Sequence, residues 1–429
     1  MNNLIWFRHN LRTQDNQSLY SATKNRGKVI GVYCIDPRQF ETNKHGFKKT
    51  EKFRAKFLLD TIRDLKTNLA QLNIPLFVYL DTPENIIPKL VHDHQISNIF
   101  LQKEWTPDEV TVNESLKAIE SLESLKWVET YDQFLFHPED IPFTDLNKLP
   151  EVFTDFRKKC EQMSKVRPTV SIAPLPKDNF FDTPDNFPSL EDLGLASFIR
   201  HKNTAFPFKG GEKAALNRVE EYFYETENLS VYKKTRNGLI GESYSSKLSA
   251  WLANGSISAR TIYWEVRNYE REVCKNEDTY WLIFELIWRD YFRYISLKHG
   301  RKIFKLDGIL GISYDWKTND KAFRQWSCGN THEPFVNANM IELLNTGFMS
   351  NRGRQNVASY WAKEWKQDWR IAAKYFESML IDFDVHSNYG NWMYNSGVGN
   401  DPRDRVFNIK RQAEMYDAKG TYQKLWLEE

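Results

Sequence analysis

The stretch LIWFRHNLRTQDNQSL, residues 4–19, sets the pattern of the first third of the chain, because a short apolar run at 4–8 gives way to a polar turn. Similar runs recur at residues 29–35, 76–80, 98–102 and 127–130. Between them, apolar side chains at helical spacing occupy residues 51–72, 83–94 and 108–122. Strands that alternate with helices form parallel sheets with both faces covered. Residues 1–130 are therefore expected to form an α/β domain with a five-stranded, Rossmann-like parallel sheet.

No G-x-G-x-x-G motif follows the first run, which argues against a dinucleotide held by that turn. Residues 131–197 are rich in Pro, Asp, Asn and Phe, with one helical stretch at 150–163, and indicate an inter-domain linker that wraps the surface. Strand patterns then almost disappear, and residues 198–429 are expected to be all-α. Helices are predicted near residues 212–225, 247–253, 259–269, 279–299, 321–328, 335–345, 354–364 and 368–380.

The composition fits a globular protein of two domains and narrows its partners. With 59 Lys plus Arg against 57 Asp plus Glu, the net charge is +2, so a nucleic acid would need a local basic face. The 14 tryptophans favour stacking on flat ligands, although most aromatic rings are expected in cores. The first residues, MNNLIWFRHN, contain neither a signal peptide nor a membrane span. The absence of any C-x-x-C pair indicates free thiols in a cytoplasmic protein, at Cys34, Cys160, Cys274 and Cys328.

The segment YSSKLSAWLANG, residues 244–255, places hydroxyls and one ammonium at the start of a short predicted helix that Gly255 ends. Free backbone N–H groups at such a start suit a diphosphate. Plain capping of the helix by serine explains the same pattern, so both interpretations stay open. The polar side chains are those of Ser245, Ser246, Lys247 and Ser249.

The segment YWLIFELIWRDYF, residues 280–292, carries Glu285, Trp288 and Arg289 on one face of a predicted helix. Because burying a lone charge is costly, the carboxylate and the guanidinium must be paired or bound to a ligand. A structural Glu–Arg bridge beside a core tryptophan and a ligand site both satisfy this condition.

Two later segments are also rich in polar groups. In GFMSNRGRQN, residues 347–356, three polar side chains share a helix face, as in a binding site or in a solvated basic turn. In LIDFDVHSNYGNWMY, residues 380–394, paired aspartates suggest a metal, but the aromatic rings favour a cleft for a flat ligand, and no metal site is expected. His386 is expected to be structural. The side chains in question are Asn351, Arg354, Gln355, Asp382, Asp384, Asn388, Trp392 and Tyr394.

In this order, the four segments resemble the FAD-binding half of photolyases and cryptochromes over residues 208–426. Residues 4–19 resemble the start of that family's antenna domain, and YKKTRNGLIGESYSSK, residues 232–247, resembles its DASH branch. The resemblance implies a deoxyribodipyrimidine photo-lyase that uses blue light and excited reduced FAD to repair cyclobutane pyrimidine dimers in single-stranded or looped DNA. The alternatives are a photoreceptor that binds DNA with little repair activity, and a DNA-binding flavoprotein without photochemistry. The chain ends at KLWLEE, without the extended tail of signalling cryptochromes.

The resemblance also implies the residues that contact FAD. Tyr232 and the run Ser245, Ser246, Lys247, Leu248 and Ser249 are expected to hold the phosphates and the ribityl chain. Asn388 is expected beside flavin N5, where a neutral amide tolerates a fully reduced anionic flavin and favours repair. Further FAD contacts are expected from Glu285, Arg289, Asn351, Arg354, Asp382 and Asp384.

Three tryptophans match those that pass an electron from the protein surface to the excited flavin in this family. They are Trp392, Trp369 and Trp316. Each of them, taken alone, is a core tryptophan by default.

The substrate residues implied by the resemblance are Glu285, Trp288, Asn351, Gln355 and Tyr394. Glu285 resembles the carboxylate that hydrogen-bonds a dimer base, and Trp288 resembles the ring that stacks on it. Tyr394 stands where ordinary dimer photolyases have Trp, and Gln355 replaces their Met. These changes predict a pocket too loose to flip a dimer out of intact duplex. Asn351 and Gln355 also replace the histidines of (6-4) photolyases, which argues against that branch.

A second chromophore is suggested by QKEWTPDE, residues 102–109, which follows the fourth apolar run. The family can bind methenyltetrahydrofolate at this place, and Glu104 is the expected pterin contact. The alternative is a surface-loop carboxylate. The expected partner is DNA, without a membrane, and the chain is expected to be a monomer.

Overall fold

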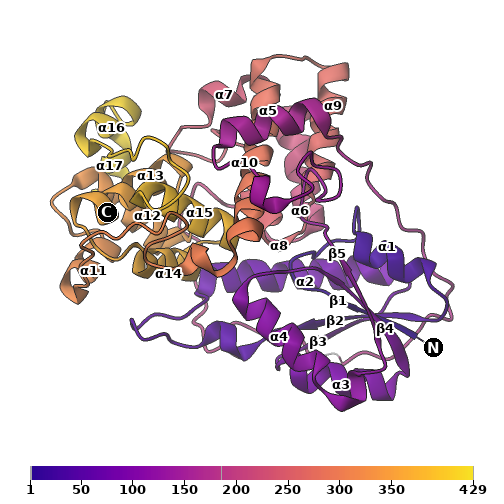
Figure 1. The fold of residues 1–429 in the computed structure, drawn as a ribbon. Coiled ribbons are helices and arrows are strands. Elements are labelled where there is room, and N and C mark those ends of the chain that lie inside the picture. The colour runs from indigo at the N-terminus through magenta and orange to yellow at the C-terminus, as the bar shows by residue number, and fades with distance from the viewer. Residues whose placement is uncertain (1, 185, 429) are drawn as a thin grey trace.

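The computed structural model describes residues 2–184 and 186–428, and it confirms an α/β domain followed by a helical domain (Figure 1). All strand pairs in the sheet are parallel, in the order β3-β2-β1-β4-β5. The chain therefore runs outward from β1 in one direction and then returns to the other side of β1 at β4. The strands are β1 Asn2–Trp6, β2 Val29–Cys34, β3 Leu76–Tyr79, β4 Ile96–Gln102 and β5 Lys126–Thr130.

Alternation of side chains along β1 explains why both faces of the sheet are covered. Ile5 lies in a core with Leu59 and Ile62 of one helix layer, whereas Leu4 lies in a separate core with Ile87 and Leu90 of the other. Neighbouring side chains of a strand point to opposite faces, so an apolar run is buried on both sides. The helices of this domain are α1 Gln17–Lys24, α2 Lys52–Gln71, α3 Pro83–Asp93 and α4 Pro107–Lys117.

The predicted linker does more than wrap the surface. Its first part, residues 134–156, buries phenylalanines in the core of the helical domain, and residues 190–195 bury leucines in the core of the sheet domain. The helical stretch predicted at 150–163 is α5, Phe153–Met163. The expectation of a surface connection was therefore wrong for these parts, because their Phe and Leu side chains pack into the cores of the helical domain and the sheet domain.

Each helix predicted in the second half has a counterpart, and further helices were not predicted. The segment 380–394 was interpreted only as a cleft, yet Val385–Ser396 forms α15. Position 390, inside this helix, must be glycine because a Cβ there would lie 2.2 Å from the Phe292 ring. Glycine therefore permits the close approach of α15 to α10. The helices are α6 Glu212–Glu220, α7 Tyr232–Thr235, α8 Ser249–Asn254, α9 Ala259–Glu272, α10 Glu277–His299, α11 Asp320–Ser327, α12 Pro334–Thr346, α13 Asn351–Ser359, α14 Trp369–Met379, α15, α16 Ile409–Tyr416 and α17 Thr421–Leu427, with π-helical turns at Glu221–Glu225 and Tyr360–Glu364.

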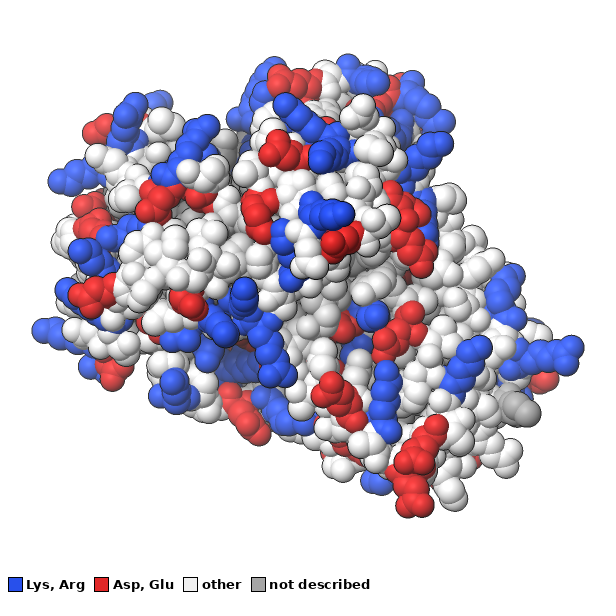
Figure 2. All heavy atoms as spheres, viewed as in Figure 1, with Lys and Arg blue, Asp and Glu red and all other residues white. Residues whose placement is uncertain are grey.

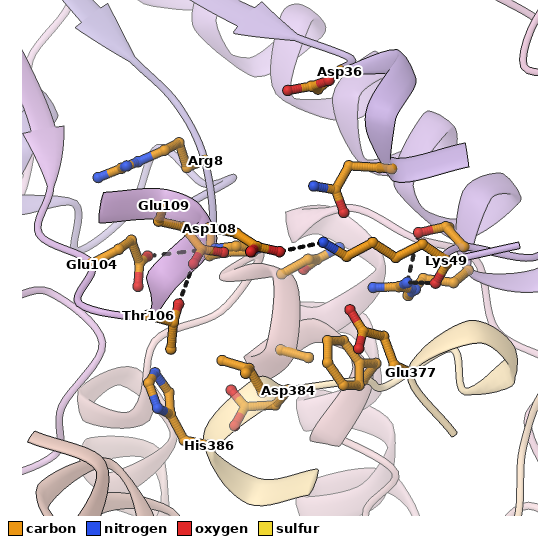
Figure 3. A pocket seen from close by; sticks show the side chains of 18 of the residues that line it. Arg8, Asp36, Lys49, Glu104, Thr106, Asp108, Glu109, Glu377, Asp384 and His386 are labelled. Carbon is orange, nitrogen blue, oxygen red and sulfur yellow. Dashed lines mark hydrogen bonds and ion pairs between the residues drawn. The ribbon is translucent and has the colours of Figure 1, made fainter. Parts of the chain in front are cut away.

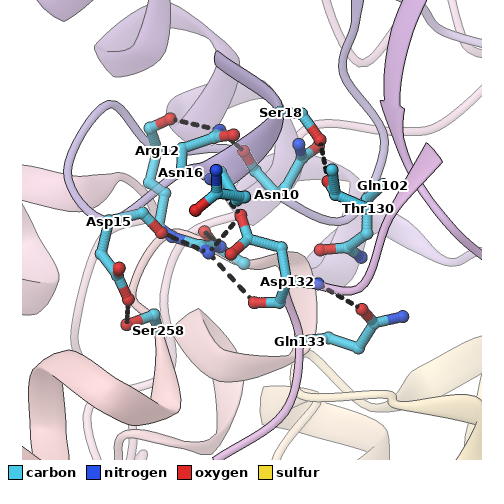
Figure 4. Close-up of polar contacts among 12 residues, drawn as sticks. Asn10, Arg12, Asp15, Asn16, Ser18, Gln102, Thr130, Asp132, Gln133 and Ser258 are labelled. Carbon is cyan, nitrogen blue, oxygen red and sulfur yellow. Dashed lines mark hydrogen bonds and ion pairs between the residues drawn. The ribbon is translucent and has the colours of Figure 1, made fainter. Parts of the chain in front are cut away.

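A buried ionic network joins the two domains (Figure 4). Arg260 of α9 lies 2.8 Å from carboxylate oxygens of both Asp15 and Asp132, and Arg12 lies 3.0 Å from Asp132. Arg12 also donates to the carbonyl of Gly255, which ends α8 as predicted, with a φ of +75°. Because all four charged groups are almost fully buried, this interdomain clamp fixes the sheet domain against the helical domain.

Among the described residues, no helix has the length and apolarity needed to cross a membrane. The surface carries mixed charges, and Figure 2 shows Lys and Arg side chains gathered where the two domains meet.

Candidate functional site

One cavity of the helical domain brings together seven residues predicted from the sequence. Its walls come from α13, from the loop after α14 and from α15. Ser350 caps α13 by accepting from the Gly353 N–H at 3.0 Å, which places positions 351, 354 and 355 on one side of the helix. The predicted residues in the lining are Asn351, Arg354, Gln355, Asp382, Asp384, Asn388 and Trp392.

Each aspartate of this cavity is held by its own guanidinium. Nη2 of Arg354 donates to both carboxylate oxygens of Asp382 at 2.9 Å, and the Ser249 hydroxyl donates to the same carboxylate at 2.7 Å. Asp384 forms an ion pair with Arg293 and accepts from the Ser387 N–H as the cap of α15. Burial alone would raise the pKa of Asp384, but the charges of Arg293 and Arg289, with the Ser387 hydrogen bond and His386, together outweigh it and lower that pKa. Among the described residues, no three His, Cys, Asp or Glu side chains group as metal ligands do.

Asn388 presents a neutral amide to the cavity. Its Nδ2 donates to the Ala373 carbonyl at 3.0 Å, and only 9% of the residue is exposed. Beside it, Trp392 is buried with its ring edge against Phe376, at a centroid distance of 5.1 Å. An amide fixed in this way offers a hydrogen-bonding group that does not change charge with pH.

The run from Ser245 to Ser249 does not form the predicted helix start. Helix α8 begins only at Ser249, and its cap residue, Leu248, makes no side-chain hydrogen bond. Serine capping, the alternative interpretation of this segment, was therefore wrong. Instead, Arg218 donates to the carbonyls of Ser245 and Ser246 at 3.2 and 3.1 Å, which shapes the loop before α8.

Lys247 is a buried lysine whose Nζ has no hydrogen-bonding partner in the part of the chain that the structure describes. It is 3% exposed, has a φ of +62°, and its Nζ lies 3.1 Å from the centroid of the Tyr244 ring. Within the described residues, neither this Nζ nor the Tyr244 hydroxyl has a hydrogen-bond partner. Burial lowers the pKa of Lys247 well below its usual value. An unpaired ammonium beside an orphaned hydroxyl fits an anionic group such as the diphosphate of FAD.

The Glu285–Arg289 bridge considered for α10 does not form. Glu285 pairs with Arg236 at 2.8 Å, while Arg289 donates to the carbonyls of Gln133 and Leu252 at 2.6 and 3.0 Å. Burial raises the pKa of Glu285 despite the opposite charge of Arg236. Sequence spacing allowed the bridge, but the tertiary structure supplies other partners for both charges.

Trp288 and Tyr394 form an aromatic pair, with ring centroids 6.1 Å apart and planes at 88°. One face of Trp288 is already covered by Phe153 of α5, at 3.6 Å and 11°. Neither Trp288 nor Tyr394 lines the cavity that contains Asn388. The role of Phe153 was missed because it lies in the predicted linker, where no motif singles it out.

The other predicted residues lie outside this cavity. Tyr232 begins α7 and is buried, which raises its pKa, with Glu285 nearby adding to the effect. Trp369 is buried at the start of α14, and its ring contacts Tyr389 at 6.2 Å. Trp316 lies half-buried before α11 and contacts Tyr314. Among the described rings, no contact joins Trp369 to Trp392 or to Trp316.

A second cavity, of about 1320 Å³, lies between the two domains (Figure 3). The strand order reverses between β1 and β4, and ligands of open α/β sheets bind at the carboxyl ends of the strands at such a point. Arg8 and His9 directly follow β1, and Glu104 follows β4, so all three line this interdomain cavity. Helix α15 closes the opposite wall with Asp384 and His386.

Glu104 is a buried carboxylate rather than a surface-loop group. It accepts from Gln102 Nε2 at 2.7 Å and lies 3.5 Å from His9 Nδ1. Burial opposes its ionisation, but the hydrogen bond and charge of His9 outweigh burial and lower the pKa of Glu104 to about 2. The interdomain cavity therefore contains an ionised hydrogen-bond acceptor at neutral pH.

Cations that lack a carboxylate hydrogen bond also face the interdomain cavity. Arg54 donates to the Lys49 carbonyl and the Thr50 hydroxyl, and Arg289 donates only to backbone carbonyls. Burial lowers the pKa of Arg289 to about 9 and that of Arg54 to about 10. The structure places Arg289 here, not in the cavity of Asn388. Such groups fit a ligand with a negatively charged part.

His386 is structural, as expected. It stacks on Trp105 at 4.6 Å and hydrogen-bonds the Ser296 hydroxyl through Nδ1 at 2.7 Å. Burial lowers its pKa to about 3, so the ring is neutral.

Comparison with known proteins gives two family models and several full-length relatives. The models described as DNA photolyase and as FAD binding domain of DNA photolyase match residues 3–177 and 281–429. The chain is 46% identical to cryptochrome DASH of Gloeobacter violaceus, over 99% of this chain and 85% of that one. It is 44% identical to cryptochrome DASH of Xenopus laevis, over 98% and 82%. The solved structure of the Synechocystis sp. PCC6803 cryptochrome superposes with a TM-score of 0.93 at 41% identity, covering 100% of this chain and 89% of that one.

Proposed function

The chain belongs to the DNA photolyase and cryptochrome family, and we propose that it is a light-driven pyrimidine-dimer photolyase acting on single-stranded or locally unpaired DNA. The observation that carries this proposal is the convergence of Asn388, Asp382, Arg354 and Trp392 on one cavity of the helical domain. These side chains supply a neutral amide, a paired carboxylate and an oxidisable ring at one place.

Bound FAD, when reduced and excited by blue light, supplies the electron that splits the cyclobutane ring. The protein binds and orients the cofactor: Lys247 meets its phosphates, and the Arg354–Asp382 pair offers hydrogen bonds to its rings. The remaining cofactor residues are proposed to be Tyr232, the run 245–249, Asn351, Asp384 and Asn388. Asn388 contributes a hydrogen bond without a charge, so it does not oppose a negative charge on the ring.

Substrate binding is proposed at Trp288, Tyr394 and Glu285. A flipped dimer presents flat apolar faces and amide edges, which an aromatic pair and a carboxylate match. Arg236 lies 2.8 Å from Glu285 and orients its carboxyl group. Stacking contributes about 1–3 kcal/mol per base, and unpairing a duplex costs a few kcal/mol. Tyr394 offers less stacking area than Trp, which favours DNA that is already unpaired.

The test is light-dependent repair of thymine dimers in matched single-stranded and duplex oligonucleotides. Repair in single strands with much weaker repair in duplex is expected. Trp288→Ala should abolish the preference for damaged over undamaged strands, and Trp264→Ala, at an exposed indole of α9, is the matched control. Reduced, illuminated protein that leaves single-stranded dimers intact would rule out this function.

A photoreceptor that binds DNA with little repair activity is the second candidate. It is favoured by the stacking of Phe153 on Trp288, which leaves only one indole face for a base. Phe153→Ala separates the two functions, because it frees that face. A higher rate of dimer repair in Phe153→Ala than in wild type would show that Phe153 limits repair, which supports the photoreceptor function of the native chain. A lower rate would show that Phe153 supports substrate binding, as expected of a photolyase.

We further propose that the interdomain cavity binds methenyltetrahydrofolate as an antenna, with Glu104 as the pterin contact. Support comes from the position of the cavity at the strand-order reversal, the ionised Glu104 and the buried Arg54 and Arg289. Protein with bound folate should absorb in the near ultraviolet beyond its FAD content. Glu104→Gln should lower that band and leave the flavin in place, and an unchanged band would return Glu104 to a structural role.

A further inference from the structure

A line of tryptophans leads away from Trp392 in a direction that sequence resemblance did not indicate. The ring centroid of Trp392 lies 6.3 Å from Trp326, and Trp326 lies 5.1 Å from Trp361. Trp361 lies 6.4 Å from Trp365, which is half-buried. These rings come from α15, α11 and the π-helical turn after α13, which gather on the C-terminal side of the helical domain (Figure 1).

The line ends at a tyrosine that is hydrogen-bonded to a histidine. Trp365 lies 4.9 Å from Tyr360, whose hydroxyl is 3.0 Å from Nδ1 of His332. Nε2 of His332 lies 3.2 Å from Glu364. Tyr360 is only 1% exposed, whereas the His332 and Glu364 side chains are 61% and 43% exposed. A buried phenol is thus connected to solvent through an imidazole and a carboxylate.

We propose that Trp365, Trp361 and Trp326 form a second electron-transfer route from Tyr360 to Trp392, with His332 as the proton acceptor. The proposal rests on the FAD site proposed above and on the photoreduction that the family resemblance implies, in which oxidised flavin, excited by light, is the one-electron oxidant of Trp392. The route is distinct from the one expected through Trp369 and Trp316.

Tyr360 loses one electron and one proton in the overall step. Oxidised Trp392 takes an electron from Trp326, and successive transfers move the electron deficit to Trp365 and then to Tyr360. The O–H bond of Tyr360 breaks, and its proton passes to Nδ1 of His332. The products are a neutral tyrosyl radical and an imidazolium beside Glu364.

Three features of the surroundings support this direction of transfer. The indole N–H groups of Trp326 and Trp361 donate to the carbonyls of Val357 and Asp368 at 3.3 and 3.0 Å, which stabilises positive charge on each ring. Burial raises the pKa of Tyr360 to about 12, so the phenol is protonated at neutral pH and must release a proton on oxidation. Nδ1 of His332, hydrogen-bonded to the Tyr360 hydroxyl, lies in position to accept that proton.

The proposal is tested by electron paramagnetic resonance after a blue flash on the full-length, FAD-loaded protein. Incorporation of ring-deuterated tyrosine identifies a tyrosyl radical by the narrowing of its spectrum. Wild-type protein should give a tyrosyl signal, and Trp369→Phe should keep it because the second route is intact. Tyr360→Phe removes only a hydroxyl and should lose the signal, with a tryptophan radical in its place. Trp361→Phe should lose it as well.

Tyr375→Phe is the matched control. Tyr375 is buried and its ring also contacts Trp326, at 6.0 Å, but it is not the tyrosine bonded to His332. Its loss should leave the signal unchanged. His332→Gln should reduce the tyrosyl yield at least tenfold while the flavin content stays the same. A tyrosyl signal that survives in Tyr360→Phe, or disappears in Trp369→Phe, would overturn the second route.

A failure of the underlying photochemistry has a different signature. If Trp392→Phe leaves the total radical yield unchanged, Trp392 is not the first donor and the second route is refuted, whereas the repair function is tested separately by the oligonucleotide assay. If the yield depends on Trp392 but only tryptophan radicals form in wild type, the second route alone is refuted.

Discussion

Replacement of Lys247 by Met is expected to stabilise the apoprotein and weaken FAD binding at the same time. The Lys247 ammonium is buried above the ring of Tyr244, and no described residue offers it a hydrogen bond. An unsatisfied charged group costs about 3 kcal/mol, and a desolvated cation–π contact returns about 2 kcal/mol. Removing both should therefore raise the stability of the apoprotein by about 1 kcal/mol.

FAD binding should change in the opposite direction. A hydrogen bond between the ammonium and a phosphate contributes about 1.5–3 kcal/mol. Its loss predicts a Kd about 10- to 150-fold higher for Lys247→Met. Titration of apoprotein with FAD gives the Kd, and urea unfolding of the apoprotein gives the free energy of unfolding.

The pH dependence provides a second check on the same residue. Because burial lowers the pKa of Lys247 from its usual 10.5, the unfolded chain binds more protons than the folded apoprotein. The stability contributed by this site in wild type should therefore rise with pH between the folded and unfolded pKa values, and Lys247→Met should lack that rise. Lys209→Met, at an exposed lysine, is the control. A Met variant that is less stable than wild type, or that binds FAD equally well, would refute the reasoning.

Three further changes probe the electron donor, the interdomain clamp and the substrate pocket. Trp392→Phe should sharply slow blue-light reduction of the bound flavin, followed by absorbance, and an unchanged rate would remove Trp392 from the route. Arg260→Ala leaves two buried carboxylates short of a partner and should cost about 3–5 kcal/mol in urea unfolding. Lys117→Ala, which breaks an ion pair on the surface, should cost less than about 1 kcal/mol, and equal losses would contradict the clamp. Tyr394→Trp should restore part of the repair in duplex DNA, and no gain would show that stacking area is not limiting.

The sequence predicted the sheet and most helices because each depends on local spacing, whereas the proposal that Asp382, Asp384 and Asn388 share one site came from the family resemblance. The shared face of Asn351, Arg354 and Gln355 follows from helical spacing alone. Asp382 lies in the loop after α14. The partner of Glu285 was not predictable, because Arg236 is distant in sequence and Arg289 was available by spacing alone. The local pattern could not decide whether Arg236 or Arg289 pairs with Glu285, and the tertiary structure favours Arg236.

Helix α15 and the interdomain cavity were missed for related reasons. Polar residues and Gly390 lower the helix propensity of Val385–Ser396, and packing against Phe292 compensates for them. The basic lining of the interdomain cavity includes Arg54 and Arg289, which lie on different domains and share no motif. The packing of the helical domain against the sheet domain, which local sequence patterns do not predict, brings them to the same cavity.

The interdomain clamp has a consequence for biosynthesis. Arg260 and Asp15 are 245 positions apart, so the ribosome completes the whole sheet domain before the cation that neutralises Asp15 and Asp132 is made. Domains generally fold in the order in which they emerge. The nascent sheet domain must therefore keep these carboxylates hydrated, with Arg12 as their early partner, and the final docking surface stays open until α9 has been translated. The time needed to translate residues 133–260 thus sets how long this unfinished, charged surface is exposed to solvent.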